Sequence, residues 1–343
     1  MNIKSIAKLS GVSTTTVSRV LNNSPYVSDA TRKKVLQIIE ENDYIPNNIA
    51  RNLHQKFSNK IGVIVADITN EFFSSAINGI SKVMDENGFQ VLFYNTDENL
   101  KNESKALHSI FEERLSGLII SPVSSKDKNT LEKLKKLTLK MKIPVVLLDR
   151  NIEGISLDAV FVDNECGAKK AVNALIKEGH RDIAIITGPI TSTPGNSRYR
   201  GYIEALRENN IPIKEEYIVS GDFKVSMAYE QTKNLLNLEN PPTAIFLSNN
   251  MTSLGALKYL KEKNYKIGED ISIIGFDEIN PFRVIDYNFS YVGRDAEQQG
   301  KIAAKVLLDR IDKRNEGVDF KSKRIVLECY LSLNGSEKIK NRE

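Results

Sequence analysis

The sequence predicts a small all-helical head followed by an α/β body built on parallel sheets. Three observations support this fold class. The chain has 343 residues, and at about 150 residues per domain this length corresponds to two or three folding units. Residues 1–46 carry apolar side chains at helical spacing, whereas the rest alternates short apolar runs with helix-length amphipathic segments. Such alternation is typical of parallel strands covered by helices on both faces.

Three short helices are expected in the head. Apolar residues between Ile3 and Leu9 fit a first helix, and Gly11 can adopt the positive φ that ends it. Ser13 is placed to cap a second helix, and Ser28 to cap a third helix that ends before residue 43. This spacing predicts a helix-turn-helix motif, whose second helix fits the major groove of DNA.

The outward face of the second predicted helix is almost entirely hydrogen-bonding. Thr14 and Thr15 lie at the end that usually meets base edges. Thr16, Ser18 and Arg19 follow, and phosphate contacts are expected among them. Further candidate DNA-binding residues in the head are Ser13, Asn22, Ser28 and Thr31. An ordinary helical hairpin with a polar face is the alternative.

Charge is unevenly distributed along the chain. Residues 1–60 contain nine lysines and arginines against four acids, a balance of +5, and the remaining 39 bases and 40 acids give −1. A basic segment joined to a nearly neutral body favours an anion-binding head, with nucleic acid as the leading candidate.

A short hinge helix is predicted after the head. Pro46 interrupts the chain, Asn47 can cap, and a helix over 48–55 would place Ala50 and Leu53 on one face with the neighbouring isoleucine. A helix shorter than about 12 residues is marginal alone, so it would need a second subunit and DNA to form. Leu53 is the candidate wedge between base steps. Its alternative roles are linker residue or contact with the body.

The body contains seven apolar runs that predict strands, at 61–65, 91–94, 117–120, 145–148, 183–186, 244–247 and 271–274. Ligands of open α/β sheets bind at the carboxyl ends of the strands. The runs are followed by polar residues, among them Ser121, Asp149, Asn249 and Asp277. Any one of these could simply cap the next helix.

Several other classes of protein are disfavoured. No apolar run approaches the roughly 18 residues of a membrane helix, and the first ten residues do not form a signal-peptide core, so a cytoplasmic location is expected. The two cysteines and three histidines are scattered, which predicts no metal site. The SxxK match at 5–8 lacks companion motifs, and GxSxG, P-loop, GxGxxG and HExxH are absent. No enzyme and no cofactor are therefore expected.

The chain resembles the LacI/GalR family of bacterial repressors. Matching motifs in the head are Gly11-Val12-Ser13, the segment 16–22 (TVSRVLN) and Tyr44-Ile45-Pro46-Asn47, and matches continue through Gly179-His180 and Ile274-Gly275-Phe276-Asp277. The resemblance implies a dimer, which could pair further as a tetramer, on pseudo-palindromic double-stranded operator DNA. It also implies a body like a type I periplasmic sugar-binding protein, with two doubly wound parallel-sheet subdomains and three crossings between them.

The resemblance implies these boundaries: a helix-turn-helix domain over 1–46, a hinge helix and linker over 47–60, and an effector-binding and dimerisation domain over 61–343. Within the last, one subdomain is expected over 61–161 plus 291–322 and the other over 162–290 plus 323–335. The crossings would then lie near Phe161, Ser290 and Lys323.

An effector site is expected in the cleft between the subdomains. Arg198, Asn249 and Asp277 match family positions that hold the effector, and their donors and acceptors suit a polyol. Three phenylalanines lie where relatives place aromatic walls, with core packing as their alternative role. The full expected set is Phe72, Phe73, Ser121, Asp149, Arg198, Phe223, Asn249 and Asp277. A sugar is the favoured effector, and a purine co-repressor or a phosphorylated carrier protein is the alternative.

The sequence departs from the family at two places. Many relatives have large residues where this chain has Thr14 and Thr15, so the operator sequence cannot be carried over. After the seventh apolar run many relatives have a Leu-Thr-Thr segment, whereas this chain reads FSYVGRD over 289–295. The crossing there is expected to differ in detail.

Overall fold

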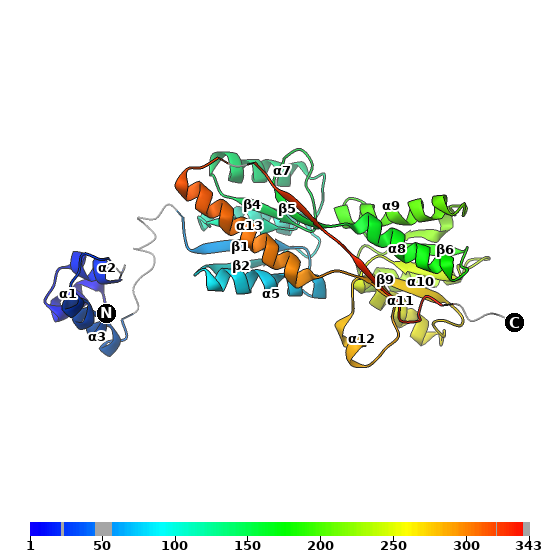
Figure 1. The fold of residues 1–343 in the computed structure, drawn as a ribbon, viewed down its shortest axis with the longest axis horizontal. Helices are drawn as coiled ribbons and strands as arrows, with labels where there is room; N and C mark the ends of the chain where they lie inside the picture. Colours follow the sequence, from blue (N-terminus) through cyan, green and yellow to red (C-terminus); the bar gives the residue numbers. More distant parts are fainter. Residues whose placement is uncertain (22–23, 45–56, 320, 339–343) are drawn as a thin grey trace. The chain divides into compact units, whose positions relative to one another are not determined.

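The structure, a computed structural model, describes residues 1–21, 24–44, 57–319 and 321–338 (Figure 1). The chain divides into two compact units, Met1–Ser58 and Asn59–Glu343. Among the described residues, no helix combines the length and apolarity that crossing a bilayer requires. The predicted hinge, including Asn47, Ala50 and Leu53, and the head residue Asn22 lie outside the described residues.

The described part of the first unit contains three helices, α1 (Ile3–Ser10), α2 (Thr14–Leu21) and α3 (Asp29–Glu41). Gly11 ends α1 with a φ of 66°, as expected for a left-handed C-cap. The Oγ of Ser13 accepts from the Thr16 amide at 3.1 Å, and the Oγ of Ser28 accepts from the Thr31 amide. The three helices enclose a small apolar core of Ile6, Ala7, Val17, Val20 and Val35.

The second unit begins with a parallel six-stranded sheet in the order β11-β5-β4-β3-β1-β2. Its strands are buried apolar runs in the centre, as expected for a sheet covered on both faces. Their bounds are β1 (Lys60–Val65), β2 (Gln90–Asn95), β3 (Gly117–Ile120), β4 (Val145–Leu148), β5 (Asp158–Val162) and β11 (Arg324–Leu327).

Helices cover the two faces of this sheet. Alternate strand residues such as Ile61 and Val63 share a core with α5 (Glu71–Glu86) and α13 (Ala296–Glu316). The intervening Gly62 faces Ile110 of α6 (Leu100–Glu112) on the other side. The helix α7 (Lys128–Lys135), with a π-helical turn over Lys136–Lys140, packs beside α6.

Helices α5 and α13 approach each other closely, and Figure 1 shows them side by side. A Cβ added at Gly79 would lie 2.1 Å from the carbonyl oxygen of Glu297, and one at Gly300 would lie 2.0 Å from that of Ala76. Only glycine therefore permits this contact. It fixes the start of α13, just after residue 294, beside the middle of α5.

A second six-stranded sheet has the order β12-β10-β9-β8-β6-β7, with β12 antiparallel and the rest parallel. One face carries α8 (Asn164–Lys177) and α9 (Thr193–Glu208). The other carries α10 (Val225–Leu236) and α11 (Asn250–Glu262). The strands are β6 (Ile183–Thr187), β7 (Ile218–Ser220), β8 (Ala244–Leu247), β9 (Ser272–Phe276), β10 (Tyr291–Gly293) and β12 (Tyr330–Ser332); the short helices are η2 (Glu215–Tyr217) and α12 (Asn280–Val284).

We call the two sheets with their helices the first and second lobes. The chain passes between them after β5, after β10 and after β11. Two crossings lie a few residues later in the chain than predicted. Tyr291 pairs with Gly275, so β10 extends the second sheet and the crossing follows Gly293 instead of Ser290. Ile325 pairs with Val160, so β11 belongs to the first sheet and the chain leaves it only after Leu327, not near Lys323.

Candidate functional site

The exposed surface of α2 carries the side chains predicted to contact DNA. Thr14, Thr15 and Arg19 are exposed, whereas Thr16 and Ser18 are half-buried. Two of the predicted residues cap helices, because Ser13 caps α2 and Ser28 caps α3. The hydroxyl groups of Ser28 and Thr31 are hydrogen-bonded to each other at 2.9 Å. Thr14, Thr15 and Arg19 are therefore the most exposed of the predicted contact residues on α2.

One cation of the head has a structural role that sequence reasoning missed. The Nη2 of Arg32 donates to the carbonyl oxygen of Ser24 at 2.6 Å, and its Nη1 donates to that of Val20 at 3.5 Å. These contacts tie α3 to the C-terminal end of α2. Arg32 therefore stabilises the orientation of the two helices and adds to the basic charge of the head.

A polar cavity lies between the two lobes. Its volume is about 20 Å³, which is room for about one water molecule. Seven of the eight predicted effector-binding residues line it; Ser121 is buried at the end of β3 but does not. The lining residues are Asn70, Phe72, Phe73, Glu98, Asp149, Arg150, Pro194, Arg198, Phe223, Asn249, Asp277 and Arg294.

Backbone strain marks four of these residues. Glu98, Asp149, Phe223 and Asp277 have φ values of 53°, 63°, 57° and 72°, in the left-handed region that non-glycine residues rarely adopt. Asp149 directly follows β4 and Asp277 directly follows β9. Strain of this kind persists only where the surrounding structure imposes it, and it clusters at ligand sites. The strained turns hold both carboxylates at the cavity.

Arg294 joins the two lobes across the cavity. Its Nε donates to Asp277 Oδ1 at 2.6 Å, its Nη2 donates to Asp277 Oδ2 at 3.2 Å, and its Nη1 donates to Asp149. The guanidinium also lies 3.5 Å from the ring centroid of Phe72. Burial lowers the pKa of Arg294, but the two carboxylates outweigh this and raise it above its ordinary value. Sequence reasoning did not identify this residue.

A second arginine, Arg150, belongs to the first lobe. Its Nη1 and Nη2 donate to the two carboxylate oxygens of Glu98 at 2.7 and 2.6 Å, a bidentate pair. The side chain of Arg150 is 3% exposed, and none of the described residues accepts a hydrogen bond from its Nε. Arg150 could have been found from the sequence, because it immediately follows Asp149.

The third arginine, Arg198, extends from α9 in the second lobe. Its Nε donates to Asn164 Oδ1 at 2.9 Å and its Nη1 donates to the Ser248 carbonyl oxygen at 2.5 Å. Its guanidinium lies 3.6 Å from the ring centroid of Phe276. Burial lowers the pKa of Arg198 to about 10, although Asp277 acts in the opposite direction.

Asn249 and the phenylalanines have structural roles as well as places in the cavity wall. Asn249 Oδ1 accepts from the Thr252 amide at 2.8 Å and so caps α11. Phe72 and Phe73 also belong to the core of the first lobe. A Cβ added at Gly188 would lie 2.1 Å from the ring of Phe223, so that glycine makes room for the aromatic wall.

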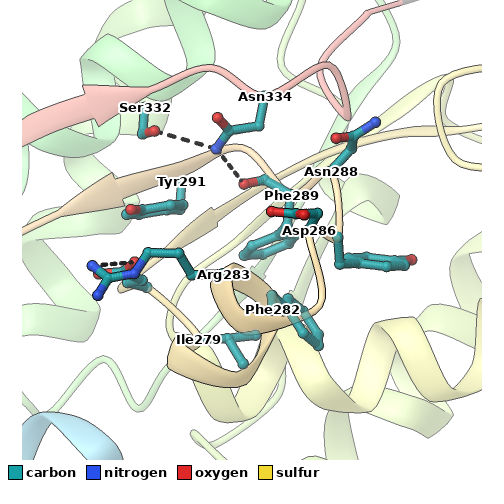
Figure 2. A pocket seen from close by; sticks show the side chains of 11 residues that line it. Ile279, Phe282, Arg283, Asp286, Asn288, Phe289, Tyr291, Ser332 and Asn334 are labelled. Carbon is teal, nitrogen blue, oxygen red and sulfur yellow. Dashed lines mark hydrogen bonds and ion pairs between the residues drawn. The ribbon is translucent and has the colours of Figure 1, made fainter.

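Further openings lie near the cavity and on the second lobe. A groove of about 670 Å³ shares Asn70, Glu98 and Phe223 with the cavity wall. A separate cavity of about 280 Å³ lies beside α12, where Asn334 donates to the Phe289 carbonyl oxygen at 2.8 Å (Figure 2). No sequence motif predicted this second cavity.

A helix-turn-helix head and a two-lobed body with a polar cavity define a class of protein, the ligand-responsive DNA-binding regulators. Residues 2–47 match the model described as bacterial regulatory proteins of the lacI family, and residues 58–329 match periplasmic binding proteins and sugar binding domain of LacI family. The chain therefore belongs to the LacI family, as a DNA-binding transcriptional repressor with a ligand-binding domain.

Individual relatives are similar over nearly the whole chain. The "Probable HTH-type transcriptional repressor ExuR" of Bacillus subtilis (strain 168) is 35% identical, covering 91% of this chain and 92% of its own length. The lac repressor dimer bound to operator and the anti-inducer ONPF has a TM-score of 0.83 at 26% identity, covering 98% and 99%. A complex of the transcriptional regulator CelR with cellobiose has a TM-score of 0.73 at 25% identity, also covering 98% and 99%.

Proposed function

We propose that this repressor binds a pseudo-palindromic operator as a dimer and that a sugar or sugar derivative in the cavity between the lobes sets its affinity for DNA. The observation that carries the proposal is the convergence of Asp149 from the first lobe with Arg198 and Asp277 from the second. Hydrogen-bonding groups from both lobes around one cavity suit a small polyol. The sugar complex of CelR and the sugar-binding description of the matched family support this class of effector.

Ligand entry requires the lobes to move. A cavity of about 20 Å³ holds about one water molecule and excludes a sugar. Polar contacts hold the lobes together around it, including a bond of 3.1 Å from Asn250 Nδ2 to Asn70 Oδ1 and one of 2.9 Å from the Asn151 amide to Thr193 Oγ1. A ligand that enters must replace some of these contacts. Its binding is thereby coupled to the relative position of the lobes.

Lobe movement then acts on DNA through the dimer. A change in the contact between subunits near the start of the body would alter the spacing of the two hinge segments, and the hinge helices would form or melt. Because short helices are marginal alone, a coupling free energy of about 1–3 kcal/mol suffices to change operator affinity about 5- to 150-fold.

A thermal-shift screen of the full chain tests the effector class. A ligand at 100 times its Kd raises the free energy of unfolding by about 2.7 kcal/mol, so sugars that bind should raise the Tm. The Arg198→Gln variant should lose that response. Stabilisation by purines such as hypoxanthine, with none by sugars or sugar derivatives, would contradict the proposed effector class.

A further inference from the structure

Arg198 is a buried cation without a hydrogen-bonded anion. Its side chain is 1% exposed, and its two hydrogen-bond acceptors, Asn164 Oδ1 and the Ser248 carbonyl oxygen, are both neutral. The nearest carboxylate oxygen, Asp277 Oδ2, lies 3.8 Å from Nη1, beyond hydrogen-bond distance. Its Nη2 has no acceptor within the part of the chain that the structure describes. Burying a charged donor in this way is costly unless a partner is supplied.

A second buried polar atom in the wall of this cavity has no hydrogen-bond partner among the described residues, and it is also an arginine N–H group. Among the described residues lining the cavity, the buried side-chain nitrogens and oxygens without a partner are Arg198 Nη2 and Arg150 Nε. Both are N–H groups, which cannot accept a hydrogen bond. The cavity therefore lacks acceptors for its own donors.

The carboxylates of the cavity wall are already engaged by arginines. Glu98 binds Arg150 through both oxygens, and Asp149 and Asp277 both bind Arg294. An incoming cation would find these acceptors occupied and would meet a neighbouring guanidinium. An incoming anion would find arginine N–H groups that have no acceptor among the described residues.

We propose that the effector is a sugar derivative that carries a carboxylate, and that this carboxylate binds the unused face of Arg198. The inference rests on the proposed function, because it specifies the effector of the same cavity. A carboxylate matches the fork of a guanidinium and would give Arg198 a hydrogen-bonded anion, because Asp277 lies 3.8 Å away. Hydroxyl groups of the same molecule would meet Asp149 and Asp277. Phosphate offers similar chemistry, so the experiment includes it as a separate arm.

Matched pairs of probes test the charge preference. Thermal unfolding of the full chain is measured at constant ionic strength with glucuronate against glucose, with galacturonate against galactose, and with glucose 6-phosphate. At least one uronate should raise the Tm and bind at least tenfold more tightly than its neutral partner. Stabilisation by glucose 6-phosphate alone would overturn the carboxylate in favour of phosphate. Equal or tighter binding of the neutral sugars, or no stabilisation by any acidic probe, would overturn the proposal entirely.

Two substitutions on α9 test whether the preference for a uronate over a neutral sugar depends on Arg198. Arg198→Gln should lower the affinity for the bound uronate at least tenfold while changing that for the neutral sugar much less. Arg200→Gln is the matched control, since Arg200 also lies on α9 but is 57% exposed. If Arg198→Gln does not fold, Arg198→Lys keeps the charge without the fork and should still prefer the acid, more weakly. Unchanged preference in a folded Arg198→Gln protein would contradict the assignment.

Operator binding separates this inference from the proposed function. A neutral sugar that stabilises the chain and changes operator affinity would overturn the carboxylate and leave the proposed function standing. A uronate that stabilises the chain without changing operator affinity would support the carboxylate and contradict the proposed function.

Discussion

Asp149 and Asp277 bind the same guanidinium, that of Arg294, although they follow strands of different sheets. Arg294 lies in the crossing between β10 and α13, so it belongs to the connection between the lobes. The close packing of α13 on α5 places it against Phe72. It therefore holds together the two carboxylates that we assign to the effector, and an effector that reaches them must compete with it.

Substituting Arg294 should destabilise the body. Arg294→Gln leaves Asp149 and Asp277 buried at 3% and 6% exposure without their cation, and breaking a buried ion pair typically costs about 3–5 kcal/mol. Urea unfolding measures the loss. Arg283→Gln is the control, because Arg283 is 82% exposed and its ion pair with Glu278 spans 3.9 Å; it should change stability by no more than about 0.5 kcal/mol. Equal effects of the two substitutions would refute the bridging role.

The sequence predicted the elements of the fold that depend on a few neighbouring residues, such as helix caps and continuous apolar strands. Gly11, Ser13 and Ser28 mark the head helices because a left-handed turn and a capping hydroxyl each need particular residue types. The apolar runs of 117–120, 145–148 and 244–247 coincide with β3, β4 and β8. The crossings could not be placed as well, because β10 has only three residues and β11 alternates exposed with half-buried positions.

Part of the cavity could also be predicted from local sequence patterns. Residues that end long buried strands, such as Asp149 and Asp277, are visible as polar groups after apolar runs. Arg294 follows a strand too short to recognise, and Glu98 lies beyond the end of β2, so neither stood out. Their participation depends on long-range packing between segments 52 and 145 positions apart in the chain.

The stability of the second lobe should fall in mild acid because of His180. Burial lowers the pKa of this imidazole, although its contact of 3.3 Å with the Glu337 carbonyl oxygen opposes the shift. As the pH falls below about 6.5, the unfolded chain takes up a proton that the folded chain does not, and the free energy of unfolding decreases. Urea unfolding at pH 7.5 and 5.5 should show a smaller decrease in His180→Asn than in the wild type. His108→Asn, at a side chain 70% exposed, is the control; an identical pH dependence in all three proteins would contradict this account.

DNA binding should depend steeply on salt. Each phosphate neutralised by the head contributes about 0.9 to the slope of log K against log salt concentration. Arg19→Gln should reduce the slope by about 2 for a dimer if each subunit loses one phosphate contact. Lys261→Gln, on exposed α11 surface of the body, should leave it unchanged. A flat salt response of the wild type would contradict an electrostatic head.

Leu53 should matter for specific DNA binding and not for the body. Leu53 lies outside the described residues. The sequence predicts a hinge helix there, with Leu53 as a wedge between base steps. Leu53→Ala should weaken specific binding at least tenfold, the equivalent of about 1.4 kcal/mol, and reduce the bend of the DNA, while the Tm of the body stays constant. Gel shifts on circularly permuted operator fragments measure both effects. Unchanged affinity and bend would remove the wedge role.

The coupling between cavity and operator is tested most directly by titrating an operator selected from a random DNA pool against the full chain, with and without a saturating cavity ligand. Fluorescence anisotropy gives the operator Kd for the wild type and for Arg198→Gln. The ligand should change the wild-type Kd by about 5- to 150-fold and leave that of the variant unaltered. An operator Kd that stays the same while the ligand saturates the wild-type cavity would contradict the account.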